Sequence, residues 1–366
     1  MNVMVRGKVR HFRTVEFDPA GNAVVLVEQR LLPHRFHRVR TRSHLETASA
    51  IRDMVVRGAG AIGATAAYGL AQGARAFRGN GLRSFAQHLD QVQGILAAAR
   101  PTAVDPVNAL CEVRKVLSKG KTVAAQQDLA LEAAHRFADR NVEECRAIGR
   151  AGAHLLRDGM TILTHCNAGW LAFVDIGTAT APMYQARAEG RDFMVLCDET
   201  RPRCQGATLT AWELSQQGVR HAVIADNAAG ALMQQGRVGL VIVGTDRVLG
   251  QTGHVVNKIG TYTKAVLAHR HGVPFYVAAP WSTLDWTTRD WRSIPIEERS
   301  QDEVTGAWGV SPGGRFRHIR IANPGSPALN PGFDVTPPEL VTGIITPTGI
   351  VKPSELRRIR HGSVRA

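Results

Sequence analysis

The chain has 366 residues, of which 44% are hydrophobic and 21% are charged, and its formal net charge is +14. This composition is typical of a globular protein with a sizeable core, and no apolar stretch reaches the roughly 18 residues of a membrane span. The N-terminal segment has no apolar core like that of a signal peptide, and the five cysteines are widely spaced without a C-x-x-C pair. We therefore expect a reduced, cytoplasmic protein without a disulfide framework, a structural zinc site or a membrane partner.

The positive charge raises the question of nucleic acid. Apart from concentrations at 35–42 and 357–365, the basic residues are scattered, and no nucleic-acid-binding motif accompanies them. We expect most of them to be solvated surface, with no nucleic-acid partner. An overall positive field favours an anionic small substrate, for example a phosphorylated one.

The first part of the chain predicts a small β-hairpin followed by helices. Alternating apolar residues at 15–17 and 23–27 flank a turn at 18–22, which is typical of a hairpin. Apolar residues then recur at helical spacing through 61–77, 86–99, 106–117 and 123–154. We place a first, hairpin and helical domain at residues 1–154.

The second part predicts an open parallel sheet. Apolar runs that end in polar residues alternate with helix-like segments, and they lie at 160–166, 193–199, 221–227, 240–246 and 274–280. Such runs indicate strands that are buried on both faces, so we expect a Rossmann-like, doubly wound α/β domain at residues 155–366. No G-x-G-x-x-G opens a helix after the first of these strands, so a dinucleotide cofactor is not implied.

Five polar residues lie just past the predicted strand ends: Cys166, Glu199, Asp226, Asp246 and Ser282. Ligands of open parallel sheets bind at the carboxyl ends of the strands. This shared position is more typical of the rim of a pocket than of a core.

Cys166 and Asp246 each allow a structural and a chemical interpretation. A lone cysteine is usually a small buried hydrophobe, and Asp246 could cap the following segment or pair with Arg247. A thiol and a carboxylate that face one pocket suit proton transfer on a small organic substrate. Metal binding by His165 and Cys166 is less favoured, because adjacent residues point in different directions and no second cluster follows at ligand spacing.

Four further stretches hold candidate anion ligands. The glycine-rich stretch 56–63 leads into a helix, and the first N–H groups of that helix could bind a phosphate beside Arg57. Alternatively, the small residues of this stretch could allow close packing of the helix. Asn257 and Lys258 could bind an anion or lie in a surface turn, and a rigid loop could present Arg100. The loop 199–206 is either a functional cluster or a cluster of surface salt bridges.

Together these segments resemble the methylthioribose-1-phosphate isomerase family. That family also contains ribose-1,5-bisphosphate isomerases and the regulatory subunits of the translation-initiation guanine-nucleotide exchange factor. The resemblance covers nearly the whole chain and rests on ordered motifs, which include IRDMVVRGAGAIG (51–63), RPTAV (100–104), THCNAG (164–169), DETRPRCQGATLTAWEL (198–214), GTDRV (244–248), NKIGTY (257–262) and NPGFDVTPPELVTGIIT (330–346).

The resemblance implies a helical N-terminal domain joined to a Rossmann-like domain, usually in a homodimer. It implies isomerisation of 5-methylthioribose 1-phosphate in methionine salvage, without metal or nucleotide. The alternatives are isomerisation of 5-deoxyribose 1-phosphate or ribose 1,5-bisphosphate, and a non-catalytic regulatory protein. The family's catalytic cysteine and aspartate fall on Cys166 and Asp246. Its phosphate and sugar contacts fall on Arg57, Gly58, Ala59, Arg100, Gln205, Asn257 and Lys258.

The reaction needs ring opening, because a sugar phosphorylated on its anomeric oxygen cannot simply open to an aldehyde. By the implied mechanism, Asp246 exchanges a proton with the ring oxygen or a hydroxyl, and Cys166 moves the carbon-bound proton from C2 to C1. A hydride shift is the other route. Departures from the common family pattern leave the substituent at C5 open. Gly60 replaces a proline, Thr245 replaces an alanine, and Asp105-Pro106 replaces an asparagine and an apolar residue. The stretch Trp170–Phe173 is unusually bulky, and the segment 249–256 is one residue longer.

Overall fold

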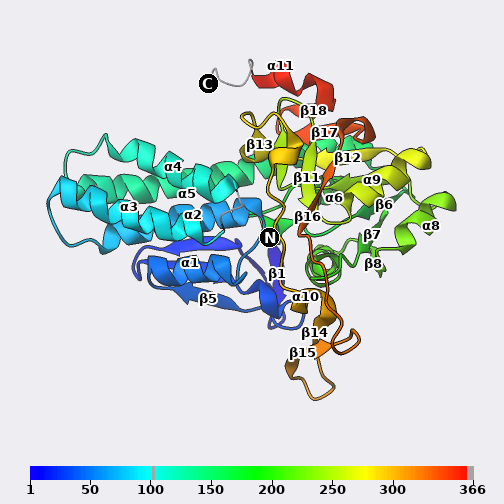
Figure 1. Cartoon of the computed structure of the whole chain (residues 1–366), viewed down its shortest axis with the longest axis horizontal. Coiled ribbons are helices and arrows are strands. Elements are labelled where there is room, and N and C mark those ends of the chain that lie inside the picture. The colour runs from blue at the N-terminus through cyan, green and yellow to red at the C-terminus, as the bar shows by residue number, and fades with distance from the viewer. Residues whose placement is uncertain (101–103, 361–366) are drawn as a thin grey trace. The chain divides into compact units, whose positions relative to one another are not determined.

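The computed structural model describes residues 1–100 and 104–360 (Figure 1). The chain forms two compact units. Unit 1 comprises Met1–Arg30, Phe36–Arg146 and Gly169–Gly177, and unit 2 comprises Leu31–Arg35, Ala147–Ala168 and Thr178–Ala366. None of the described helices has both the length and the apolarity that crossing a membrane would need. The domain boundary between residues 154 and 155 stays a prediction.

Unit 1 begins with short antiparallel strands. β1 (Asn2–Val5) pairs with β2 (Lys8–His11), while β4 (Ala23–Val27) pairs with both β3 (Val15–Asp18) and β5 (Arg38–Thr41). The β3–β4 hairpin is the one predicted from the alternating apolar residues. Strands β1, β2 and β5 were not predicted. Each has only four residues, and basic side chains interrupt the apolar residues of β2 and β5.

A largely helical core follows these strands, and its helices are α1 (His44–Arg52), α2 (Ala59–Ala76), α3 (Leu82–Ala98), α4 (Val104–Leu117) and α5 (Val123–Gly152). Helix α2 consists mostly of alanine and glycine and is buried from Gly60 to Ala74. A helix that is apolar on every side lies inside a core, and α1, α3 and α4 pack around it. The predicted helical ranges agree with α2 to α5 within a few residues.

Unit 2 is built on a seven-stranded sheet in the order β18–β17–β12–β9–β6–β7–β8. All neighbouring strands are parallel except β17 and β18. The strands are β6 (Thr161–Thr164), β7 (Met194–Asp198), β8 (His221–Ile224), β9 (Leu240–Val243), β12 (Phe275–Ala278), β17 (Gly343–Thr346) and β18 (Gly349–Val351). Numbered along the chain from β6, the parallel strands follow the 3-2-1-4-5-6 order of doubly wound Rossmann folds. The predicted fold class is confirmed.

Helices cover both faces of this sheet, and alternate strand residues enter two separate cores. Leu163 and Val241 share one core with α8 (Ala228–Gln234) and α9 (Thr261–Arg270). Ile162 and Ile242 share the other with α6 (Ala181–Ala188) and α7 (Ala211–Gln216). Burial on both faces explains why these strands read as continuous apolar runs.

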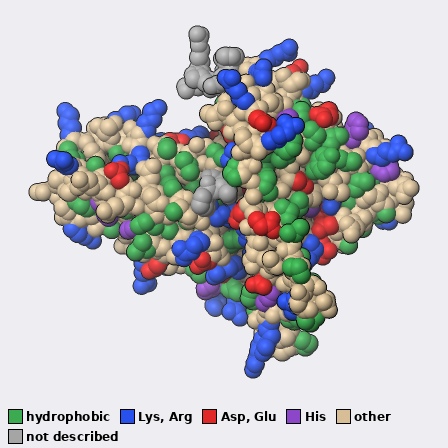
Figure 2. Space-filling view, viewed as in Figure 1, with side chains coloured by type: hydrophobic (Ala, Val, Ile, Leu, Met, Phe, Trp, Pro, Cys, Tyr) green, Lys and Arg blue, Asp and Glu red, His purple; other side chains and the backbone are tan. Residues whose placement is uncertain are grey.

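The smaller elements of unit 2 were not predicted from the sequence. A second sheet has the order β13–β10–β11–β16, with β13 (Leu284–Asp285), β10 (Arg247–Leu249), β11 (Val255–Lys258) and β16 (Phe333–Thr336). β14 (Gly306–Val310) and β15 (Phe316–Arg320) form a hairpin. Short helical segments complete the described chain: α10 (Asp302–Thr305), α11 (Leu356–Arg360), a π-helix η4 (Gly206–Thr210), and 3-10 turns η1 (Gln29–Leu31), η2 (Ala153–Leu155), η3 (Trp170–Ala172), η5 (Trp281–Thr283), η6 (Trp291–Ser293), η7 (Pro338–Leu340) and η8 (Pro353–Glu355). On the face shown in Figure 2, lysine and arginine side chains are dispersed rather than gathered in one patch.

Candidate active site

The order of the main sheet reverses between β6 and β9, because β7 and β8 extend it on one side while β12 and β17 extend it on the other. Ligands of this fold bind outside the carboxyl ends of the strands at such a switch point. Cys166 follows β6 and Asp246 follows β9. Their two loops are in contact, since a Cβ added to Gly244 would lie 2.2 Å from the Cβ of Ala168. The fold therefore brings the thiol and the carboxylate candidates onto touching loops.

The backbone of Cys166 is held in the left-handed region, with a φ of 64°. A side chain in this region costs about 1 kcal/mol or more, and such strain persists only where the surroundings impose it. Two threonine hydroxyls do so here. Thr200 Oγ1 accepts from the Cys166 N–H at 2.8 Å, and Thr210 Oγ1 donates to the Cys166 carbonyl at 2.7 Å. Imposed strain of this kind is typical of functional residues.

The thiol of Cys166 contacts the amide of Gln205, which the family resemblance assigns to substrate binding. Its Sγ donates a hydrogen bond to Oε1 of Gln205 at 2.9 Å, and the two residues are only 8% and 4% exposed. An acceptor beside the thiol stabilises its protonated form relative to the thiolate. Gln205 therefore influences the state of Cys166 directly, which the spacing of the motifs did not reveal.

The two arginines of the 199–206 loop anchor it to a neighbouring segment. The Arg201 guanidinium donates to the carbonyls of Glu303, Val304 and Gly306, and Arg203 pairs with the Glu303 carboxylate at 2.8 Å. Burial raises the pKa of Glu303, but hydrogen bonds from Arg299 and Arg203 lower it to about 2. Arg203 therefore fits the salt-bridge interpretation of this loop, whereas Arg201 holds the loop through backbone carbonyls.

The main chain around Asp246 is fixed by the second sheet. The Asp246 N–H donates to the Val256 carbonyl at 3.0 Å. The Thr245 hydroxyl accepts from the Arg247 N–H at 3.1 Å and lies 3.0 Å from the Val256 carbonyl. Arg247 pairs with Asp285 at 3.2 Å. The hydrogen bonds of Thr245 thus stabilise the turn that carries Asp246.

Asn257 and Lys258 end strand β11, so the surface-turn alternative for them is wrong. Asn257 is 5% exposed, and its Nδ2 donates to Thr261 Oγ1 at 3.0 Å. Lys258 Nζ donates to the Gly332 carbonyl at 2.9 Å and lies 4.5 Å from the centroid of the Phe333 ring. Because β11 pairs with β10, which follows Asp246, one hairpin carries the carboxylate and both anion-binding candidates.

The other four candidates belong to unit 1. Arg57 is 7% exposed, and Ala59 begins α2. Gly58 has a φ of 91°, and a Cβ there would lie 2.4 Å from the Cα of Ala172, so the close-packing alternative holds for it. Arg100 is partly buried, and Pro101–Ala103 of its motif lie outside the described residues. Binding of a phosphate by these four residues stays a prediction.

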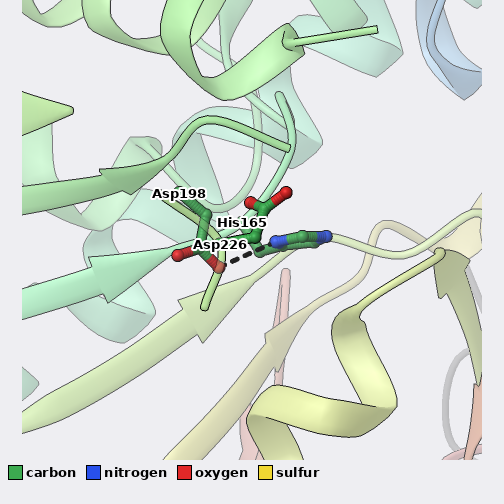
Figure 3. Close-up of side chains that lie close together, drawn as sticks. All are labelled: His165, Asp198 and Asp226. Carbon is green, nitrogen blue, oxygen red and sulfur yellow. Dashed lines mark hydrogen bonds and ion pairs between the residues drawn. The ribbon is translucent and has the colours of Figure 1, made fainter. Parts of the chain in front are cut away.

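A titratable cluster with two buried members and one partly buried member lies at the ends of β6, β7 and β8 (Figure 3). His165, Asp198 and Asp226 offer ligand atoms within 4.8 Å of one another, which is a spacing that a metal ion could use. Protein groups already bond most of these atoms, although Oδ1 of Asp198 is buried without a hydrogen-bond partner among the described residues. Asp226 accepts the N–H groups of Thr200 and Arg201, both at 2.7 Å.

Lys264 places a positive charge beside the carboxylate of Asp198 in this cluster. Asp198 Oδ2 lies 2.9 Å from His165 Nδ1 and 3.2 Å from Lys264 Nζ. A second cation beside Lys264 would be repelled, so the arrangement favours an internal ion pair over a metal site. The sequence suggests His165 only as a metal ligand and gives no signal that singles out Asp198 or Lys264.

Comparison with known proteins extends these observations. The model of the Initiation factor 2 subunit family matches residues 55–353, a range that includes every candidate site residue. Methylthioribose-1-phosphate isomerases of Brucella anthropi and Methylobacterium nodulans are 48% and 49% identical to the chain over 355 residues. These alignments cover 94% of the chain and 95% of each relative. The chain belongs to the methylthioribose-1-phosphate isomerase family.

Solved structures support membership of the isomerase family in both units. The 5-methylthioribose 1-phosphate isomerase of Pyrococcus horikoshii is 41% identical, with a TM-score of 0.84 and coverage of 96% of both chains. A protein from A. fulgidus described as translation initiation factor eIF-2B, subunit delta, is 39% identical, with a TM-score of 0.80 and coverage of 94% of this chain and 97% of that one. The family thus has relatives with either description at comparable similarity.

Proposed function

We propose that the chain is a methylthioribose-1-phosphate isomerase that converts 5-methylthioribose 1-phosphate to 5-methylthioribulose 1-phosphate, an aldose–ketose isomerisation of methionine salvage. The observation that carries this proposal is the identity of 48% over 94% of the chain to relatives of that description. The neighbouring loops of Cys166 and Asp246 at the switch point support it, because a thiol and a carboxylate suit proton transfer on a sugar.

In the proposed mechanism, Asp246 protonates the ring oxygen as the ring opens and takes up the proton of the C2 hydroxyl. Cys166 removes the hydrogen of C2 as a proton and returns it to C1. Gln205 supports this exchange because its amide can present oxygen to a thiol or, after rotation, nitrogen to a thiolate. Arg57, Gly58, Ala59, Arg100, Asn257 and Lys258 bind the phosphate and sugar hydroxyls.

The decisive experiment compares substrates. The purified chain is assayed with 5-methylthioribose 1-phosphate, 5-deoxyribose 1-phosphate and ribose 1,5-bisphosphate, and kcat/KM is measured for each. We expect the methylthio substrate to give the highest value. A preference of more than tenfold for either of the others would contradict the proposed substrate and leave the reaction class intact.

A regulatory binding protein is the second candidate, because the A. fulgidus structure of comparable similarity carries an initiation-factor description. The two candidates differ in one result. A regulatory protein would turn over none of the three sugar phosphates, whereas an isomerase turns over at least one.

The proposal includes a homodimer in a reducing cytoplasm, without metal or nucleotide cofactor. The five cysteines are all free, which suits such a compartment. Light scattering coupled to size-exclusion chromatography measures the assembly directly. A mass of one chain across the micromolar range would contradict the dimer without affecting the proposed reaction.

A further inference from the structure

His165 is locked by two hydrogen bonds that run to acceptors. Its Nε2 lies 2.8 Å from the carbonyl oxygen of Ile259, and its Nδ1 lies 2.9 Å from Oδ2 of Asp198. A carbonyl can only accept, so Nε2 carries a hydrogen. The Asp198 carboxylate is the partner of Nδ1. Both ring nitrogens are therefore committed to the protein.

The surroundings leave this ring no freedom. His165 is 2% exposed, Asp198 is fully buried, and Lys264 is 3% exposed with its ammonium beside the same carboxylate oxygen. Gly260, at a φ of 100°, faces the ring directly, because a Cβ there would lie 2.9 Å from Cε1 of His165. Close packing therefore fixes the imidazole in addition to its two hydrogen bonds.

The two hydrogen bonds lead to two different parts of the proposed site. Asp198 ends β7, and its carbonyl accepts from the Thr200 hydroxyl that in turn holds the N–H of Cys166. Ile259 directly follows Asn257 and Lys258 at the end of β11. One imidazole thus connects the loop of the reacting thiol with the strand of the anion-binding pair.

We propose that His165 is a positioning residue with two separable functions, which rest on the isomerase function proposed above. Its Nδ1 bond to Asp198 sets the position of the Cys166 thiol. Its Nε2 bond to Ile259 sets the position of Asn257 and Lys258. His165 does not touch the reacting atoms in this assignment.

Two conservative variants separate these functions. The asparagine amide reaches the place of Nδ1, so His165→Asn retains the Asp198 bond and loses the Ile259 bond. The glutamine amide reaches the place of Nε2, so His165→Gln does the reverse. We expect His165→Asn to raise KM about tenfold with kcat within about threefold, and His165→Gln to lower kcat about tenfold or more with KM within about threefold.

A third variant tests whether hydrogen bonds or charges matter. Asp198→Asn combined with Lys264→Met removes both buried charges together, which avoids an unpaired ion. The asparagine amide can still donate to Nδ1 of a neutral imidazole, so both hydrogen bonds of His165 remain. We expect kcat and KM to stay within about threefold of the parent values. A loss as large as that of His165→Gln would overturn positioning by hydrogen bonds.

A readout without turnover keeps this inference independent of the proposed reaction. Alkylation of Cys166 by iodoacetamide is followed by peptide mass analysis, with exposed Cys111 in unit 1 as the internal reference. We expect His165→Gln to speed alkylation of Cys166 at least threefold, because its loop is released, and His165→Asn to leave the rate unchanged. If the parent chain isomerises none of the sugar phosphates, the proposed reaction is wrong, and the alkylation rates still decide the link to Cys166. Equal effects of the two variants on kcat, KM and alkylation would overturn the inference.

Discussion

The thiol of Cys166 donates to the amide oxygen of Gln205 at 2.9 Å, and this contact ties the reacting group of the proposed isomerase to the loop after β7. Replacing the amide by a carboxylate keeps the shape of the side chain and adds a negative charge beside the sulfur. We expect Gln205→Glu to slow alkylation of Cys166 at neutral pH about tenfold, because a carboxylate opposes formation of the thiolate. Gln205→Met, which removes the hydrogen bond without adding charge, should not slow it; equal slowing by both variants would contradict an electrostatic cause.

The proposed reaction depends on two side chains at the switch point. Cys166→Ser and Asp246→Asn should each lower kcat by about 10²-fold or more, because each removes a proton-transfer group while preserving the shape of the site. Steady-state kinetics measures the loss, and circular dichroism establishes that each variant is folded. A folded variant of either kind with near-parental kcat would show that the residue has been assigned the wrong role.

The strained backbone of Cys166 predicts an unusual order of stabilities. At a φ of 64°, alanine retains the penalty of a left-handed residue, whereas glycine does not. We expect Cys166→Gly to be about 1 kcal/mol more stable than Cys166→Ala, although glycine normally destabilises folded chains. Urea denaturation of the two variants measures this difference. An alanine variant as stable as the glycine variant would show that the conformation carries no strain.

The raised pKa of Asp334 predicts that its contribution to the stability of the folded chain falls as the pH rises. Its carboxylate accepts the N–H groups of Gly260 at 2.7 Å and Tyr262 at 3.1 Å, and burial nevertheless raises the pKa of Asp334 to about 6. Because this folded-state pKa exceeds the usual value of 3.8, the protonated group contributes stability below pH 3.8 that is lost as the pH rises through 6.

The Asp334→Asn variant isolates this contribution, since the asparagine side chain does not titrate. The free energy of unfolding of the variant, minus that of the parent, should increase by about 2 kcal/mol between pH 4 and pH 7. Urea denaturation at a series of pH values measures it. A difference that stays constant or decreases over this range would contradict the raised pKa.

Replacing Arg201 should destabilise the folded chain more than replacing Arg203, which lies in the same loop. Its guanidinium donates to three backbone carbonyls of 303–306, whereas Arg203 makes a single, partly exposed pair with Glu303. We expect Arg201→Met to cost about 2 kcal/mol and Arg203→Met less than about 1 kcal/mol. Thermal unfolding of both variants measures the contrast, and an equal loss would show that the carbonyl contacts contribute little.

The sequence predicted the fold class because the parallel strands are buried on both faces, so their apolar runs stand out without any knowledge of tertiary structure. It also placed Cys166 and Asp246 beyond strand ends, which is where the structure has them. It could not predict which strands are neighbours, since the order around β6 and β9 depends on contacts between distant segments. The switch point became visible only from the sheet.

The sequence predicted the hydrogen-bonding partners poorly. In the sequence, Asp198 is the polar end of a predicted strand and Lys264 lies within a helical segment. Nothing in their spacing indicates that both lie close to His165. Thr200 and Thr210 are equally inconspicuous, although they hold the backbone of Cys166. Short antiparallel strands such as β10 and β11 were missed because each has too few residues for alternation to be recognised.

The pairing of β10 with β11 has a consequence for how the family can vary. Val248 faces Val255 across this hairpin, and the Asp246 N–H bonds to the Val256 carbonyl, so the separation between Asp246 and Asn257 is set by strand register. The extra residue expected in the segment 249–256 can be absorbed by the turn beyond that register. Chains of different length in this turn can therefore keep the same separation between the two positions.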